Sequence, residues 1–150
     1  MLLIRRALAT GSATAFCAAV ARADDVASPV SGKRVALSGY NPVACFTDRR
    51  PVQCISRYWY EFDDTVYLFA SDEHRASFIA DPDHYAPQYR GYCAMSVSIG
   101  GHYEGLPGTW EILNGKLCVF GKTTGVQDFA TDQPGVIARG QANWAATRPK

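Results

Sequence analysis

The stretch that decides the fold is residues 57–87, RYWYEFDDTVYLFASDEHRASFIADPDHYAP, because it holds the densest set of local folding signals. Residues 58–62 are aromatic and alternate in character, and residues 65–69 are mostly apolar, which is typical of strands. Asp63 and Asp64 lie between them, and aspartates favour turns because their side chains bond the nearby backbone. The stretch therefore predicts a β-hairpin.

Two helix starts follow this hairpin. Ser71 is typical of an N-cap, and Asp72 and Glu73 suit a first helical turn because the helix dipole favours anions there. Asp81 and Pro82 end that helix and favour a second short one, since proline is tolerated at a first helical position. We expect a unit of hairpin, helix and helical turn.

The segments on either side predict further hairpins. Residues 34–38, 43–46 and 52–55 predict short strands, with a turn at TDRRP (47–51) between the second and the third. An Asn-Gly pair at 114–115 separates apolar residues 110–113 from 116–120, and this pair favours a type I′ turn. Residues 93–99 are small and apolar, and they fit a buried strand and a short helix equally well.

The tail beyond residue 123 predicts two helices. Asp132 is the expected cap of the second helix, Pro134 lies in its first turn, and its apolar face consists of Val136, Ile137 and Trp144. Together the elements predict an α+β fold of small antiparallel hairpins with short helices packed on one side. No internal repeat is evident from the sequence.

Residues 1–23 predict a signal peptide. Arg5 and Arg6 precede an apolar run over residues 7–20, and Ala-Arg-Ala at 21–23 places small residues at the cleavage site. We expect a periplasmic or secreted protein beginning with a mobile leader over residues 24–33. The apolar run is too short for a membrane anchor, so no span is expected after cleavage.

The charge balance argues against nucleic-acid binding. After residue 23 the chain carries 12 basic and 14 acidic side chains, a net charge of −2. No basic stripe is available to neutralise phosphates.

Several segments resemble the YHS domain family. They are FAS at 69–71, Phe78, ADPDHY at 80–85, VALSGYNPVA at 35–44, YAPQYRGYCA at 85–94, WEI at 110–112, NGKL at 114–117 and NW at 143–144. The resemblance covers residues 34–145 and implies a YHS-like domain over residues 34–146, similar to exported YHS proteins.

The resemblance raises the question of a metal site. Metal-binding relatives carry three cysteines, and this sequence has Ala44, Ala70 and His74 at those positions. The three-thiolate site of those relatives therefore cannot form here. Cys93 matches the cysteine of the family's Gly-Tyr-Cys motif. A different set, Cys93 with His74 and His84, is the candidate, and imidazole with thiolate suits copper or zinc.

Each candidate ligand also has a plain interpretation. A buried free cysteine is usually a small core residue, which is the alternative for Cys93. His74 is alternatively a solvated residue on a charged helix, and His84 a residue that faces water.

Cys45 and Cys54 are candidates for a disulfide. If residues 46–52 form the turn of a hairpin, the two cysteines lie opposite each other, close enough for a bridge. The alternative is two unrelated buried thiols. Cys93 and Cys118 then form either a second bridge or two free thiols.

These observations favour an exported binding module that is not an enzyme, with handling of copper or zinc through Cys93 as the leading hypothesis. One alternative is a thiol-based redox or small-molecule enzyme centred on Cys93. Another is a plain interaction domain with no site. The sequence names no partner.

Overall fold

The computed structural model describes residues 32–150, so the predicted signal peptide and most of the predicted leader lie outside the described residues. The elements in chain order are η2 Ala36–Gly39, α1 Pro42–Thr47, β1 Ile55–Phe62, β2 Thr65–Phe69, α2 Asp72–Ala80, α3 Pro82–Tyr85, η3 Gln88–Gly91, α4 Ala94–Val97, β3 Trp110–Leu113, β4 Lys116–Val119, α5 Gly125–Ala130 and α6 Gln133–Thr147. Among these residues, no helix has the length and apolar character needed to cross a membrane.

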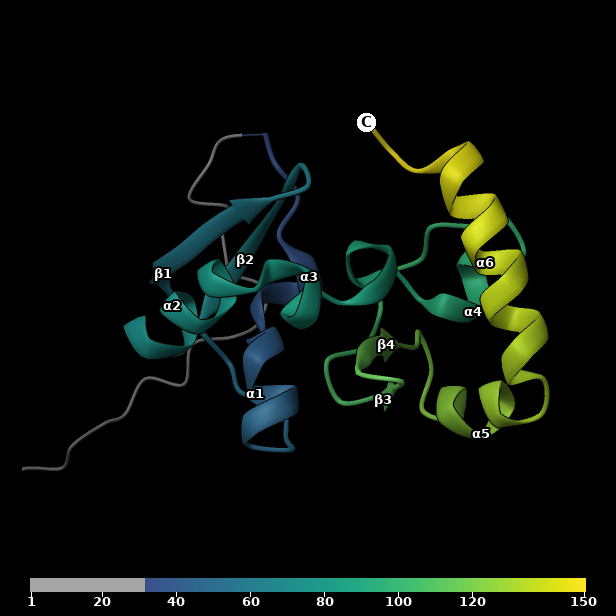
Figure 1. Ribbon diagram of the computed structural model, residues 1–150, viewed down its shortest axis with the longest axis horizontal. Coiled ribbons are helices and arrows are strands. Elements are labelled where there is room, and N and C mark those ends of the chain that lie inside the picture. Colours follow the sequence, from purple (N-terminus) through teal and green to yellow (C-terminus); the bar gives the residue numbers. More distant parts are fainter. Residues whose placement is uncertain (1–31) are drawn as a thin grey trace, which may run out of the picture.

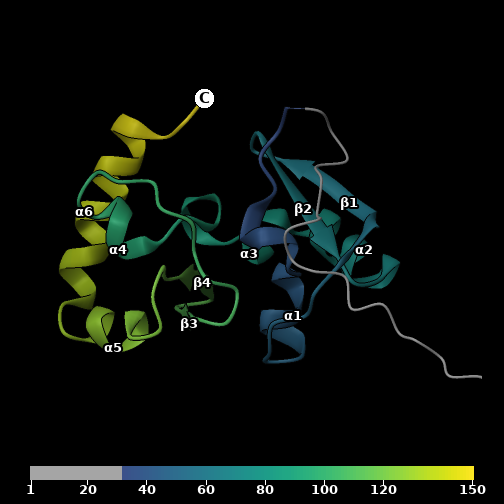
Figure 2. The same ribbon diagram turned by 180° about the vertical axis from the view of Figure 1, so that it is seen from behind.

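The elements form two halves that lie side by side (Figure 1). The first half contains the antiparallel hairpin β1–β2 with α1, α2 and α3, and the second contains the antiparallel hairpin β3–β4 with α4, α5 and α6. Figure 2 shows the same division from behind. The predicted α+β class, antiparallel hairpins with short helices, is confirmed.

The predicted helix caps are present. Ser71, Asp81 and Asp132 each accept a hydrogen bond from the backbone N–H three residues on, at 3.2, 3.1 and 3.2 Å. Each bond satisfies a backbone donor that the first helical turn leaves without a partner.

Both hairpin turns have left-handed residues at their two central positions. Asn114 and Gly115 have φ of 50° and 75°, which confirms the type I′ turn, and Asp63 and Asp64 have φ of 48° and 54°. Such turns match the twist of the flanking strands.

Replacing Gly115 with alanine is expected to lower the free energy of unfolding by about 1 kcal/mol, because alanine is strained at positive φ. An added Cβ at this position meets nothing within 4 Å, so backbone strain is the expected cause of the lost stability and a steric clash is not. Gly108 is a matched control, since it is equally open but has no positive φ. Urea unfolding of both alanine variants measures the difference, and an equal effect at the two sites contradicts the account.

The strands predicted over residues 34–38 and 43–46 are wrong. These segments form the 3₁₀ turn η2 and the helix α1. Asn41 explains why the second segment is a helix, since its Oδ1 accepts the N–H of Val43 at 3.0 Å and Pro42 takes the first helical position. The same capping chemistry that predicts α2 therefore operates here. The open choice over residues 93–99 is also resolved, because residues 94–97 are the helix α4.

The two halves repeat the same order of elements, a relationship that is not evident from the sequence. Gly39 and Gly91, 52 positions apart, each end a turn of three consecutive residues with positive φ: 54°, 50° and 81° in the first, 55°, 55° and 86° in the second. Tyr40 and Tyr92 follow, and each donates its backbone N–H to the carbonyl three residues back at 3.0 Å. Each turn then leads into a short helix, α1 or α4.

The elements after these turns keep a spacing of 51 positions. Phe78 in α2 and Phe129 in α5 are both 0 % exposed. Asp81 and Asp132, which cap the following helices, share an unusual backbone conformation, with φ/ψ of −148°/73° and −150°/53°. Residues 36–85 and residues 88–147 are therefore two units with the same order of elements.

Strand β4 joins the cores of the two units. Leu117 and Val119 pack in the core of the first unit, with Phe69 and Phe78, whereas Cys118 packs in the second core with Phe129. Successive residues of a strand point to opposite faces, so one short strand supplies both cores.

Candidate ligand groove

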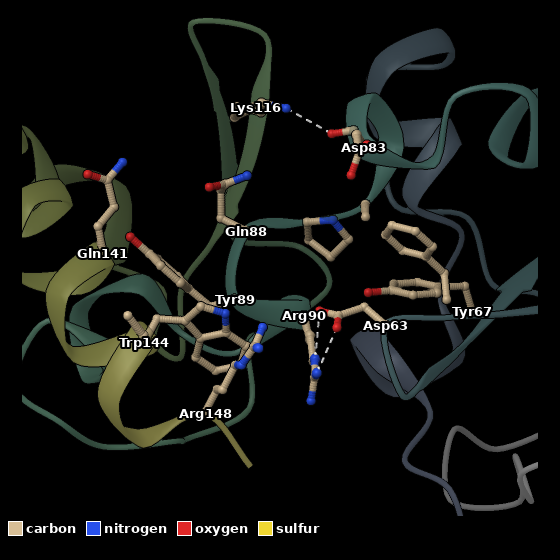
Figure 3. Close-up of a pocket in the computed structure, with 14 residues that line it drawn as sticks. Asp63, Tyr67, Asp83, Gln88, Tyr89, Arg90, Lys116, Gln141, Trp144 and Arg148 are labelled. Carbon is tan, nitrogen blue, oxygen red and sulfur yellow. Dashed lines mark hydrogen bonds and ion pairs between the residues drawn. The ribbon is translucent and has the colours of Figure 1, made fainter. Parts of the chain in front are cut away.

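A groove of about 510 Å³ lies between the two units. Figure 3 shows its labelled side chains: on one wall Gln141, Trp144 and Arg148, on the other Asp63, Tyr67 and Asp83, with Gln88, Tyr89 and Arg90 along the connection and Lys116 at one end. The helices α3 and α6, which are equivalent in the two units, face each other across it. Its volume is in the range of small-molecule sites.

Arg90 is the most buried charged residue in the groove, with 8 % of its side chain exposed. Its Nε and Nη2 donate to the two carboxylate oxygens of Asp63 at 2.9 and 2.8 Å, and its Nη1 donates to the carbonyl of Pro149 at 2.8 Å. The planar guanidinium forms this two-pronged pair in a way that lysine does not. Arg90 therefore ties the first hairpin to the connection between the units and to the segment after α6.

The bonds of Arg90 leave part of its donor capacity unused. A guanidinium has five N–H groups, and three of those of Arg90 are hydrogen-bonded within residues 32–150. Its Nη2 also lies 3.7 Å from a carboxylate oxygen of Asp64. The carbonyl of Arg90 accepts a bond from Nη1 of Arg34 at 2.7 Å, which helps to hold the left-handed turn.

Lys116 closes the opposite end of the groove. It lies at the start of β4, and its Nζ donates to the backbone carbonyl of Asp83 at 2.9 Å across the two units. Both residues are exposed, so this bond is open to exchange with water or with a ligand group.

Aromatic side chains form much of the groove wall. The ring of Trp144 contacts that of Tyr89 edge-on, with centroids 5.8 Å apart, and the guanidinium of Arg90 lies 5.7 Å from the Trp144 ring. The wall opposite includes Tyr67, which is 1 % exposed, and burial raises the pKa of its hydroxyl. Tyr67 is therefore a neutral hydrogen-bonding group at physiological pH.

The charge pair beside Tyr67 affects the titration of Asp63. The hydrogen bonds from Arg90 lower the pKa of Asp63 below its usual value of 3.8, and Arg148 adds a smaller effect in the same direction. The same hydrogen bonds raise the pKa of Arg90. Both groups are thus held in their charged forms.

Asp63→Asn is expected to make the protein less sensitive to acid. Because the folded-state pKa is lowered, the charged Asp63 contributes stability above its unfolded-state value of 3.8, and this contribution is lost as the pH falls through the folded-state pKa. Unfolding measured between about pH 5 and pH 2 should show a smaller loss of stability in the variant than in the wild type. An equal loss contradicts this role for Asp63.

The structure does not bring the three candidate metal ligands together. Cys93 is 6 % exposed and packs in the second core with Cys118 and Phe129. His84 lies on α3, where its ring packs at a tilt against that of Phe46, with the ring centroids 4.7 Å apart. Within residues 32–150, no group of three histidine, cysteine or acidic side chains is placed to hold a metal ion.

His74 is half-buried and bonded, in contrast to the interpretation of a solvated residue. Its Nδ1 lies 2.6 Å from Nδ2 of Asn41, whose Oδ1 accepts the N–H of Val43. Because the Asn41 oxygen faces Val43, its amide nitrogen must donate to His74, and Nδ1 must accept. His74 thus helps to hold the start of α1 against α2.

The hairpin that motivated a disulfide between Cys45 and Cys54 is absent. Cys45 lies in α1 and belongs to the first core, whereas Cys54 belongs to a separate small cluster with Val66 and Leu68. All four cysteines within residues 32–150 are free thiols in this structure. The geometry therefore favours the alternative of two unrelated buried thiols.

The buried thiols are expected to react slowly in the native protein. Burial raises the pKa of Cys45 and Cys54 to about 12 and that of Cys118 to about 11, and the thiolate is the reactive form. Ellman's reagent at pH 8 should label these three slowly without denaturant. In urea without reductant it should label all four, and recovery of only two thiols there contradicts the free state.

The residues that shape the groove were missed by the sequence interpretation. Arg90, Lys116 and Arg148 carry no motif that marks them as neighbours, and Trp144, which is predicted on the apolar face of its helix, is only half-buried. The one local signal is the Gly-Tyr pair at 91–92, which repeats the pair at 39–40 and marks the turn that contains Arg90.

Comparison with known proteins identifies no relative: no protein-family model, no curated protein and no solved structure matches this chain.

Proposed function

We propose that the protein is a non-enzymatic binding module that holds a small organic molecule in the groove between its two units. The main observation that supports the proposal is the groove itself, which has aromatic walls and contains Arg90 with 8 % of its side chain exposed. Small-molecule sites in proteins combine such walls with a few fixed polar groups. Arg90 is fixed by Asp63 and Pro149, and Tyr67 by burial.

We also propose that the module is a YHS-like protein that is exported. The motif segments over residues 34–145 support the first part. The arginines, apolar run and small residues of the first 23 positions support the second.

The groove is a better candidate than Cys93. A reactive or metal-binding thiol needs access and a polar neighbourhood, and Cys93 is 6 % exposed among apolar side chains. Copper or zinc bound at one equivalent to the purified protein would contradict this preference, and elemental analysis measures it.

A blocking substitution tests the proposed site. Ala145 is an exposed residue of α6 that lines the groove, so Ala145→Trp is expected to fill it without disturbing a core. Ala142→Trp is the matched control, because Ala142 is exposed on the same helix outside the groove.

The probes are sodium benzoate, benzamide and benzylamine, followed by ligand-observed NMR. We expect at least one to bind the wild type and Ala142→Trp, and none to bind Ala145→Trp. Failure of all three probes on the wild type, or equal binding to Ala145→Trp, contradicts the proposal.

A further inference from the structure

We infer that the ligand of the groove is an organic anion with a flat apolar body, and that its anionic group lies at the end of the groove formed by Arg148 and Arg90. This inference rests on the proposed function and adds the chemical class and orientation of the ligand.

The charges at the two ends of the groove differ. At one end Lys116 and Asp83 both line the groove, and Nζ of Lys116 donates to the backbone carbonyl of Asp83, so this end has one positive and one negative side chain. At the other end the charge of Asp63 is matched by Arg90, to which both of its oxygens are bound. Asp64 lies 3.7 Å from Nη2 of Arg90 but does not line the groove. Among the charged side chains that line this end, Arg148 is the one left without an opposite charge, so the lining there is net positive.

Arg148 has its donors available. Its backbone N–H ends α6 by donating to the carbonyl of Trp144 at 3.0 Å, but within the part of the chain that the structure describes its side chain makes no hydrogen bond or ion pair. It acts on Asp63 only through its charge. Its guanidinium matches a carboxylate with two parallel bonds, which gives this end a preference for planar anionic groups.

Arg90 supplies a second, fixed part of this end. Its position is set by Asp63 and by the carbonyl of Pro149, and it retains two N–H groups without a hydrogen bond within residues 32–150. A donor that is already oriented and 8 % exposed binds an anion without a large loss of side-chain freedom.

The aromatic wall of the groove is the reason for inferring a ligand with a flat apolar body. Trp144 lies in the last turn of α6, four positions before Arg148, and both residues line the groove, so an anion held by Arg148 places the rest of the ligand along the Trp144 ring. Tyr67 and Phe62 line the opposite wall. Stacking of a flat ring on an aromatic wall makes the free energy of binding more favourable than the buried area alone would.

The test compares three ligands of the same shape and different charge by calorimetry at low salt. Benzoate is expected to bind the wild type about 10-fold or more tightly than neutral benzamide, and benzylamine more weakly still. Binding of benzoate should weaken as salt is added, because one charge at this end is exposed.

Two arginine variants locate the anion. Arg148→Gln should weaken benzoate about 10-fold while leaving benzamide nearly unchanged. Arg139→Gln is the control, because Arg139 lies on the same helix and pairs with Asp132 outside the groove. It should bind benzoate like the wild type.

The outcomes separate the two proposals. If benzamide or benzylamine binds as tightly as benzoate, or if Arg148→Gln retains full benzoate affinity, the assignment of an anionic ligand is overturned. The proposal that the groove is a binding site is kept in that case. If no probe binds, the groove itself is rejected.

Discussion

Phe78→Ala is expected to lower the free energy of unfolding by about 4 kcal/mol, the largest single effect in the first unit. Phe78 is 0 % exposed and contacts four other aromatic rings, at centroid distances of 4.9 to 6.3 Å: Tyr60, Phe62, Tyr67 and Phe69. Removing its ring takes away buried apolar surface and leaves a cavity that rigid aromatic neighbours do not fill.

The equivalent substitution in the second unit provides the comparison. Phe129 is also 0 % exposed, and its ring contacts that of Phe120 at 5.1 Å. Phe129→Ala should lower the free energy of unfolding by a similar amount, because it removes the ring at the same position of the repeated unit. Denaturant unfolding of both variants measures this, and a loss below about 1 kcal/mol at either site contradicts the assignment of these residues as core centres.

Arg90→Ala is the second substitution with a large expected effect, a loss of about 2 kcal/mol of stability together with loss of binding in the groove. Three hydrogen bonds to Asp63 and Pro149 disappear. The effect falls below the 3 to 5 kcal/mol that is typical of a broken, fully buried pair, because the Asp63 side chain is 41 % exposed and regains water.

Arg90→Lys is the control that separates charge from geometry. A lysine keeps the charge but offers no planar fork for the Asp63 carboxylate, so it should restore little of the stability. Full recovery with lysine would show that charge alone holds the three segments together. A double-mutant cycle with Asp63→Asn isolates the pair, and an absence of coupling would contradict the role given to the Arg90–Asp63 bonds.

Local chemistry explains which parts of the fold could be predicted. The turn at Asp63 and Asp64 and the caps at Ser71, Asp81 and Asp132 depend on residues within four positions, and all are present. Residues 34–38 and 43–46 do not form the predicted strands, because short apolar runs fit strands and helices alike and Asn41 caps a helix there.

The repeat is not evident in the sequence because the two units share few residues. Gly39 and Gly91 serve the same turn, as do the tyrosines that follow them, but between these positions the two units share few residues. What the units share is backbone conformation, such as the left-handed pair before each glycine. That pair consists of residues that do not signal positive φ.

The groove could not be predicted because it depends on how the units are placed. Arg90 meets Asp63 across 27 positions and Pro149 across 59. Lys116 reaches the carbonyl of Asp83 across 33. No periodicity or motif encodes these distances, since they arise from the packing of both units around β4.

A titration of the ¹⁵N-labelled protein, residues 24–150, with sodium benzoate, followed by amide and tryptophan indole shifts, directly tests whether the space between the two units is a binding site. Binding in the groove should produce progressive shifts that cluster at the indole of Trp144 and at the backbone of Tyr89, Arg90 and Arg148, with smaller shifts at Asp63 and Lys116 at the two ends. Shifts that are absent at saturating benzoate, or that cluster around Cys93 and away from the groove, would contradict the claim that the space between the two units is a binding site.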